Sequence, residues 1–160
     1  RQMCIRDRDK GPDYRFDCMG DMIMASNFAG IAFGNAGVGA VHALSYPLGG
    51  TYHVPHGEAN YQFFTEVFKA YERKAPAGQM QLLKEKLAKL MGCTPATLFD
   101  EIDALLSALI AKNSLRTYGM KEAEIEGFAD AVIATQQRLL ANNYTPLTRD
   151  EIRDIYKALY

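Results

Sequence analysis

Apolar side chains recur at every third or fourth position over most of the chain beyond residue 57, and this spacing places them on one face of an α-helix. The segments with this spacing are 58–71, 79–90, 98–110, 125–140 and 152–159. We find no convincing β-strand and no internal repeat. The sequence therefore predicts an all-α fold, a bundle of six or seven helices.

The region between residues 21 and 56 is expected to begin with a helix and to end in a loop. Residues 21–33 are apolar nearly all round, which is typical of a buried helix. A short segment over 38–46 is expected to stop at Pro47, because proline removes a backbone donor. Residues 47–56 contain two prolines and two glycines, so we expect a loop there.

Residues that favour helix ends mark three later boundaries. Gly92 is a plausible C-terminal stop for the helix that precedes it. Thr94, followed by a proline, is expected to cap the start of the next helix. Thr148 and Glu151 have the spacing of a capping box, in which each side chain bonds the backbone N–H of the other residue.

Length and composition limit the classes of protein to which the chain can belong. Its 160 residues suggest one domain, and 18 basic against 19 acidic residues leave no charge footprint for nucleic acid. The sequence contains no run of about 18 uninterrupted apolar residues, so no membrane span is predicted. Three widely spaced cysteines are typical of reduced thiols in a cytoplasmic protein. Residues 1–10 are expected to be a non-native or disordered end, and 11–160 a single helical domain.

All three histidines, His42, His53 and His56, fall within 15 residues. Few residue types bind transition metals or carry protons near neutral pH, so the cluster suggests a metal site or a proton relay. A turn could bring His42 and His56 to one point, although their spacing does not require it. Two imidazoles are also an incomplete catalytic site, which normally has about three protein ligands. Histidines that are merely hydrogen-bonded in the core remain the alternative.

Gly37 and Gly39 resemble part of a phosphate-binding loop, but no strand precedes them and His42 replaces the third glycine of that motif. Close helix packing or a kink is therefore the favoured explanation for both glycines.

Residues 29–60 carry a resemblance to a known family. Their sequence, AGIAFGNAGVGAVHALSYPLGGTYHVPHGEAN, resembles the signature region of the iron-containing (group III) alcohol dehydrogenases. The resemblance extends over about 20–160 and includes the loop at 143–146. It implies a two-domain dehydrogenase of which this chain is the C-terminal, metal-binding helical domain, without the N-terminal α/β domain that binds NAD(P).

The family pattern also implies roles for individual residues. His42 and His56 match two of four ligands for a divalent metal, Fe²⁺ or alternatively Zn²⁺, while the Asp and His of the other two positions belong upstream. Phe33 matches a position beside the nicotinamide of NAD(H), which the absent domain would mainly hold. Tyr46 stands where many relatives carry a histidine thought to help proton transfer. Tyr46 and His53 are therefore the candidate catalytic residues.

Within the family, residues 42–61 are most similar to members that act on 4-hydroxybutyrate. The resemblance implies an NAD-dependent, cytoplasmic, dimeric dehydrogenase that interconverts this hydroxy acid and succinate semialdehyde by hydride transfer. The present chain alone is expected to be inactive. Relatives acting on butanol or propanediol, and a non-catalytic helical metal-binding or interaction module, are the alternatives. An apolar face that includes Met22, Met24 and Phe33 is expected to be exposed by the absence of the first domain.

Overall fold

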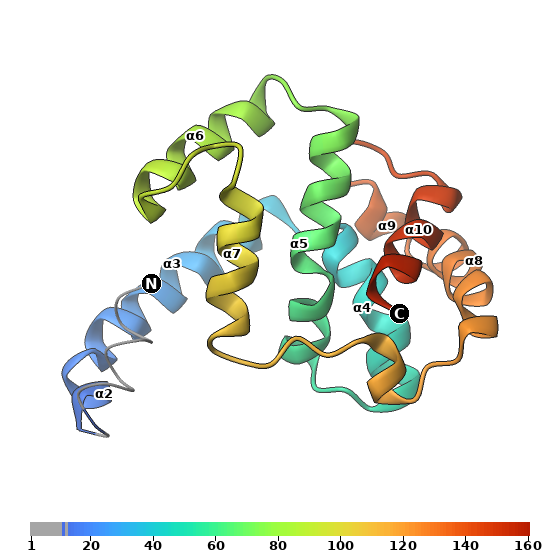
Figure 1. Ribbon diagram of the computed structural model, residues 1–160, viewed down its shortest axis with the longest axis horizontal. Helices are drawn as coiled ribbons and strands as arrows, with labels where there is room; N and C mark the ends of the chain where they lie inside the picture. Colours follow the sequence, from blue (N-terminus) through green and yellow to red (C-terminus); the bar gives the residue numbers. More distant parts are fainter. Residues whose placement is uncertain (1–10, 12) are drawn as a thin grey trace. The chain divides into compact units, whose positions relative to one another are not determined.

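The computed structural model of the chain describes residue 11 and residues 13–160, apart from the side chain of residue 15. The expectation for residues 1–10 lies outside these described residues. Everywhere in the described part the chain forms helices, turns and loops without a strand, which confirms the all-α fold (Figure 1). Seven of these α-helices have ten residues or more, in line with the predicted six or seven.

The chain divides into two compact units, residues 1–37 and 38–160. The described helices of the first unit are α2 (Tyr14–Asp17) and α3 (Met19–Ala36). The second unit contains α4 (Ala40–Tyr52), α5 (His56–Lys74), α6 (Gln79–Met91), α7 (Leu98–Ser107), the 3-10 turns η1 (Leu115–Tyr118) and η2 (Glu122–Glu124), α8 (Ile125–Thr135), α9 (Gln137–Leu140) and α10 (Arg149–Leu159).

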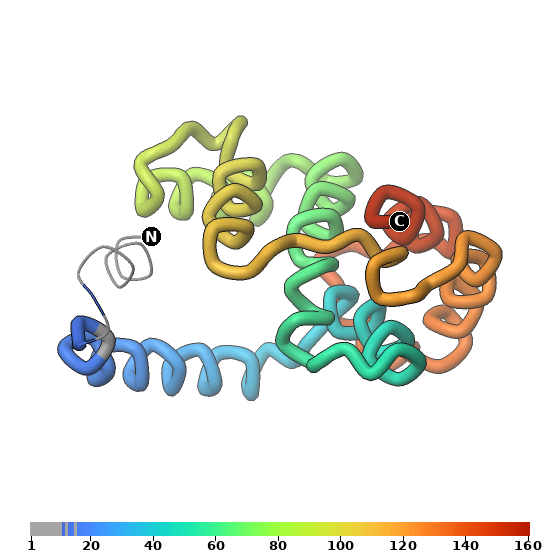
Figure 2. Tube along the Cα trace, turned by 60° about the horizontal axis from the view of Figure 1, so that its bottom comes forward, coloured from blue at the N-terminus to red at the C-terminus, as the bar shows by residue number. Residues whose placement is uncertain are grey.

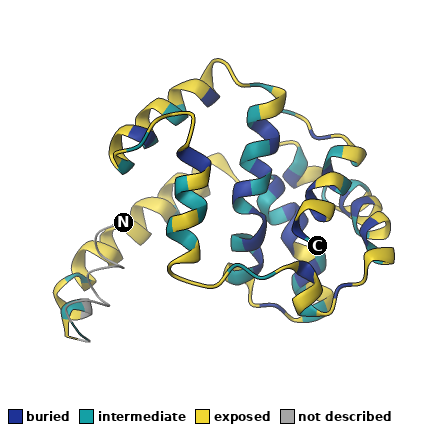
Figure 3. Ribbon diagram, in the orientation of Figure 1, coloured by how far each residue is buried: buried dark blue, intermediate teal, exposed yellow. Residues whose placement is uncertain are grey.

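Helix α5 is the centre of the second unit. It contacts α4, α7 and α10, and Figure 2 shows it between α7 on one side and α4 with α10 on the other. The buried residues of these helices face one another (Figure 3). The predicted apolar face of the last helix is confirmed, because Ile152, Ile155, Tyr156 and Leu159 are all buried. The rings of Tyr156 and Phe63 meet edge to face, with centroids 5.2 Å apart.

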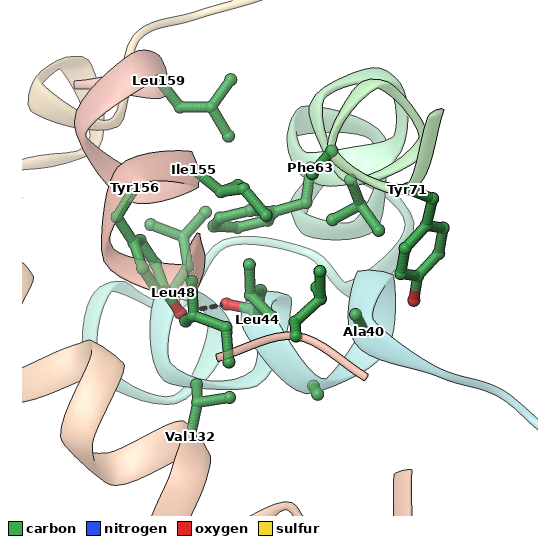
Figure 4. Packing of buried hydrophobic residues seen from close by; sticks show 14 of the residues in the cluster. Ala40, Leu44, Leu48, Phe63, Tyr71, Val132, Ile155, Tyr156 and Leu159 are labelled. Atoms are coloured by element: carbon green, nitrogen blue, oxygen red, sulfur yellow. Dashed lines mark hydrogen bonds between the residues drawn. The ribbon is translucent and has the colours of Figure 1, made fainter. Parts of the chain in front are cut away.

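Helix α4 corrects the expectation for residues 38–56. Pro47 lies inside this helix and does not end it, and only residues 53–55 form a loop. Proline deprives the preceding turn of one N–H donor. Leu44 and Leu48 lie on either side of it and are fully buried, so core packing holds the helix together across the proline. The Tyr156 hydroxyl donates a hydrogen bond to the Leu44 carbonyl in this turn, over 2.6 Å (Figure 4).

Helix α3 confirms a helix over residues 21–33, but the expectation that it is buried is wrong. None of its residues is buried, and Ile23 and Phe28 are 63% and 62% exposed. An apolar helix is buried only where other elements cover it, and the described part of its unit offers only the short helix α2. Met22, Met24 and Phe33 are exposed, as expected for the apolar face.

The predicted helix ends are confirmed at two of three places. Gly92 adopts the left-handed conformation after α6, and Thr148 and Glu151 form the capping box of α10. Thr94 does not cap α7, which begins at Leu98. Its hydroxyl instead accepts from the Thr97 N–H at 3.3 Å, so a separate turn precedes the helix. The apolar pattern over 98–110 outlasts the helix because Leu109 and Ile110 lie in an exposed turn.

Two remaining expectations concern cysteines and membranes. Cys18 and Cys93 form no disulfide, while Cys4 lies outside the described residues. No single helix in the described part of the chain is long and apolar enough to span a membrane, although α3 and α4 taken together pass that test by length and composition.

Candidate metal centre

The structure brings His42 and His56 together. His42 lies in the first turn of α4, and His56 is the first residue of α5. The loop over 53–55 turns the chain back, helped by His53, whose backbone is left-handed with φ of 55°. The two imidazole ring centroids are 5.2 Å apart. The expected convergence of these two rings is thus present within the second unit.

The two rings fit one divalent ion as a pair of ligands. An ion about 2.0–2.1 Å from one nitrogen of each imidazole, at a tetrahedral angle, places the ring centres about 5 Å apart. Burial lowers the pKa of His42, and its proximity to His56 lowers it further, so the neutral form that binds metals is favoured. Within the described part of the chain no third His, Cys, Asp or Glu joins them. The pair could therefore supply two of the four ligands of a tetrahedral metal site.

Tyr46 completes a group of three rings. It lies one turn beyond His42 on α4, and its ring centroid is 6.4 Å from that of His42 and 6.1 Å from that of His56. The Tyr46 side chain is 40% exposed. A phenol hydroxyl can donate and accept a hydrogen bond, so Tyr46 can relay a proton between this site and solvent.

The two other predicted site residues are not in this ring group. His53 is exposed at the end of α4, and the described contacts include no hydrogen bond or ring contact between it and the pair. Phe33 belongs to the first unit, where its side chain is 59% exposed. The roles predicted for His53 and Phe33 remain predictions.

Two polar residues that the sequence reasoning missed lie behind the histidines. Asn60 Nδ2 is 3.0 Å from His56 Nε2, and Asn60 Oδ1 accepts from the Ser45 hydroxyl at 2.6 Å. Asn60 is four positions after His56 and Ser45 is three after His42, so each shares a helix face with its histidine. This spacing of a polar residue from a candidate ligand was the available signal.

A pocket of about 460 Å³ adjoins the pair. His42 and Asn60 are its polar side chains beside the Tyr61 ring, and its remaining lining is apolar: Val41, Phe64, Ile102 and Leu106. No Lys, Arg, Asp or Glu is among these lining residues. The volume and the lining suit the hydrocarbon part of a small molecule.

Backbone conformation explains Gly37, and close packing explains Gly39. Gly37, with φ of 74°, follows the last residue of α3. A Cβ at Gly39 would lie 2.8 Å from Asn143 Oδ1, which accepts the Ala40 N–H at 2.8 Å. Gly39 therefore lets Asn143 reach the first turn of α4.

Comparisons with known proteins agree on one family. The family model described as Fe-containing alcohol dehydrogenase family, C-terminal, matches residues 6–160. A 4-hydroxybutyrate dehydrogenase of Clostridium kluyveri is 57% identical over 152 residues, which are 95% of this chain and 41% of that protein. No solved structure matches the chain significantly.

More distant relatives have other substrates in their names. A long-chain-alcohol dehydrogenase of Geobacillus thermodenitrificans is 35% identical over 88% of this chain and 36% of its own length. An NADPH-dependent butanol dehydrogenase of Clostridium saccharobutylicum is 28% identical over 87% of this chain and 37% of its own. The chain thus spans about two fifths of the length of these relatives.

Proposed function

The chain belongs to the Fe-containing alcohol dehydrogenase family, and from this membership we propose that it is the metal-binding part of an NAD-dependent alcohol dehydrogenase. We propose that the whole enzyme interconverts 4-hydroxybutyrate and succinate semialdehyde, as the name of the Clostridium kluyveri relative suggests. The observation that carries the proposal is the approach of His42 and His56 to 5.2 Å within a matched family region.

His42 and His56 would hold the divalent metal, Fe²⁺ or Zn²⁺, together with ligands from elsewhere in the enzyme. Neutral imidazole nitrogens suit either ion. When bound, such an ion acts as a Lewis acid that lowers the pKa of an alcohol hydroxyl. NAD(H) would be held mainly by the N-terminal domain of the whole enzyme, and Phe33 would contact its nicotinamide.

The residues of this chain would then orient the substrate and move its proton. The apolar pocket beside His42 and Asn60 would hold the carbon chain and exclude water from it. In the oxidation direction the alcohol loses a hydride to the nicotinamide and a proton from its oxygen. The Tyr46 hydroxyl would take up that proton while releasing its own, and the exposed His53 would pass a proton to solvent.

Small alcohols and aldehydes are the proposed substrates, and the names of the relatives support this class. A cytoplasmic homodimer without a nucleic-acid or membrane partner is proposed for the whole enzyme. The near-neutral charge of the present chain supports the part of this proposal that concerns nucleic acid.

Activity and metal content of the whole enzyme, with and without His42 and His56, test the proposal. We expect His42→Ala and His56→Ala each to lower kcat/KM for 4-hydroxybutyrate at least about a hundredfold, because a metal ligand is lost. Each substitution should also lower the amount of metal that the enzyme binds. Tyr61→Phe, in the same pocket, is the control and should retain the metal. Full activity of both histidine variants would instead indicate a non-catalytic helical module.

One observation favours a second substrate class. The pocket beside the pair has no cationic side chain to receive a carboxylate, and relatives act by name on butanol and long-chain alcohols. Comparing kcat/KM for 4-hydroxybutyrate, butanol and propanediol distinguishes the two classes.

The chain alone should show no turnover of NADH with succinate semialdehyde, because hydride transfer needs the nucleotide-binding domain. Appreciable turnover by the chain alone would contradict the proposal that the N-terminal domain of the whole enzyme holds NAD(H).

A further inference from the structure

We propose that the pocket between α5 and α6 binds a straight-chain aliphatic carboxylate, with Lys86 receiving the carboxylate and apolar side chains holding the chain. The pocket has a volume of about 320 Å³ and lies within the second unit. None of its lining residues belongs to the candidate metal centre or to the pocket beside that centre. The inference therefore goes beyond the proposed function and does not depend on it.

Three aromatic rings line the pocket in contact with one another. The ring centroids of Phe68 and Tyr71 are 5.9 Å apart, and those of Tyr71 and Tyr144 are 6.2 Å apart, both pairs edge to face. The Tyr144 hydroxyl donates to the carbonyls of Ala75 and Ala77, which ties its ring to the loop between α5 and α6. A lining that is already ordered costs a ligand less free energy to bind than one that must first be ordered.

The first turns of α6 supply the other lining side chains and make the pocket amphipathic. Met80 is buried, and Leu82 and Leu83 add further apolar surface. Gln79 and Lys86 are the polar side chains that α6 contributes, and both are exposed. Such a lining suits a ligand whose apolar chain leaves water while its polar end stays close to solvent.

The charge beside the pocket is positive, and this charge selects an acid among amphipathic ligands. Lys86 forms no ion pair within the described part of the chain, whereas the nearby Lys84 pairs with Glu72. Glu85 accepts a hydrogen bond from Gln81 at 2.9 Å and does not line the pocket. No Asp or Glu is among the lining residues, and α6 carries three lysines against one glutamate. The Lys86 ammonium is therefore available to a carboxylate and would repel an amine.

The volume of the pocket sets the length of the chain that it can hold. At roughly 30 Å³ for a water-sized group, 320 Å³ holds about ten non-hydrogen atoms. Octanoate, with eight carbons and two oxygens, has this size and is the probe. Burial of each methylene should lower the Kd about fourfold, so octanoate should bind about fifteenfold more tightly than hexanoate. Decanoate should gain little more, because its additional methylenes would find the pocket full.

Methyl NMR of the whole enzyme, labelled with ¹³C in its methionine methyl groups, locates the ligand. Octanoate should shift the Met80 signal, which is assigned by its disappearance in Met80→Leu. The Met91 signal is the internal reference, because Met91 ends α6 and does not line the pocket. Octylamine has the same chain length and a positive charge, so it should leave the Met80 signal in place at concentrations where octanoate shifts it.

Exposed positions of α6 offer matched variants that leave the core intact. Lys86→Gln should raise the octanoate Kd about three- to fivefold, the value of one partly solvated ion pair, without changing the Kd of octanol. Lys89→Gln, three positions further along α6 and outside the lining, is its control. Leu82→Gln should raise the Kd of both ligands about fivefold, because apolar surface is lost. Leu90→Gln, at a position 82% exposed and outside the lining, should change neither Kd.

The outcomes decide the proposal independently of the metal centre. An octanoate Kd above about 1 mM, equal affinities for hexanoate and octanoate, or an unchanged octanoate Kd in Lys86→Gln would each overturn it. A Met80 signal that follows the enzyme concentration and not the octanoate concentration would also overturn it, since the pocket would then be a contact between copies. His42→Ala should bind octanoate with unaltered affinity, and a loss of binding there would place octanoate at the metal centre instead.

Discussion

Tyr156 shows how much of this structure depends on single polar atoms. Its side chain is fully buried between α10 and α4, and burial raises the pKa of its hydroxyl far above the usual range. That hydroxyl donates to the Leu44 carbonyl over 2.6 Å, three residues before Pro47. The buried hydroxyl of Tyr156 thus finds its acceptor in a backbone carbonyl of α4.

Replacing Tyr156 by Phe tests the value of this bond. We expect the free energy of unfolding to fall by about 1–2 kcal/mol, because a buried hydrogen bond is lost while the ring is kept. Urea unfolding followed by circular dichroism measures the change. Tyr144→Phe is the control, since the hydroxyl of that 42% exposed tyrosine donates to the carbonyls of Ala75 and Ala77 near solvent. Equal losses in the two variants would show that burial of the bond is unimportant.

The lowered pKa of the Asp103 carboxyl should make the stability of the fold depend on pH. Burial alone would raise the pKa of its carboxyl, but hydrogen bonds from Lys112 and Thr65 outweigh burial and hold the pKa below its ordinary value. A carboxyl with a lowered pKa in the folded state stabilises the fold above its ordinary pKa of about 3.9. That contribution to stability is lost as the pH falls from the ordinary pKa through the lowered pKa of the folded state.

We therefore expect Asp103→Asn to be less stable than the unaltered chain at pH 7, by about 1–2 kcal/mol. The difference should shrink between about pH 4 and pH 2, where the unaltered carboxyl becomes protonated. Urea unfolding at several pH values measures both effects. Asp100→Asn is the control, because Asp100 is 74% exposed and forms its ion pair with Lys69 near solvent. A constant difference between Asp103→Asn and the unaltered chain at every pH would contradict this explanation.

At the scale of the element, α4 is held at its start and in its middle by residues distant in sequence. Its first N–H, that of Ala40, is received by Asn143, and its middle is bonded by Tyr156. Gly39 leaves room for the Asn143 amide at the start of the helix. The position of His42, two residues after Ala40, therefore depends on the loop between α9 and α10.

Gly39→Ala tests this link between loop and helix. The added Cβ would displace Asn143 Oδ1, so we expect a loss of about 1 kcal/mol, the typical value of a lost helix cap. In an Asn143→Ala background the same substitution should cost far less, because the obstructing oxygen is gone. Gly127→Ala, in α8 with nothing within 4 Å of its Cβ, should be neutral or stabilising. Additive losses from Gly39→Ala and Asn143→Ala in urea unfolding would contradict the proposed contact.

The whole molecule consists of two units with unlike degrees of burial. The second unit contains the continuous buried core, whereas α3 in the first unit has no buried residue. Stability against local opening follows buried contacts, so the two units should differ in backbone protection.

Hydrogen–deuterium exchange measured by mass spectrometry tests this difference. We expect amides of α3 to exchange at least about a hundredfold faster than those of the buried α5 face around Phe63 and Val67. The exposed face of α8 serves as the comparison for solvent access within the second unit. Similar protection of α3 and α5 would show that α3 is covered in solution.

The sequence was sufficient for features that depend on local chemistry. Helical spacing, the left-handed Gly92 and the Thr148–Glu151 capping box each arise within a few residues, so all three could be predicted. The three clustered histidines were likewise visible, because their residue type limits their chemistry. At the candidate site, the histidine cluster and the family resemblance predict His42, His56 and Tyr46 from the sequence.

Features that depend on distant neighbours were decided only by tertiary structure. Pro47 stays helical because Leu44 and Leu48 are buried and Tyr156 reaches its turn from the other end of the chain. The exposure of α3 likewise depends on what covers it, because a helix pattern specifies an apolar surface but not its partner. Ser45 and Asn60 meet only when α4 and α5 pack. Local sequence fixes which groups are available, and the free energy of packing determines which of them meet.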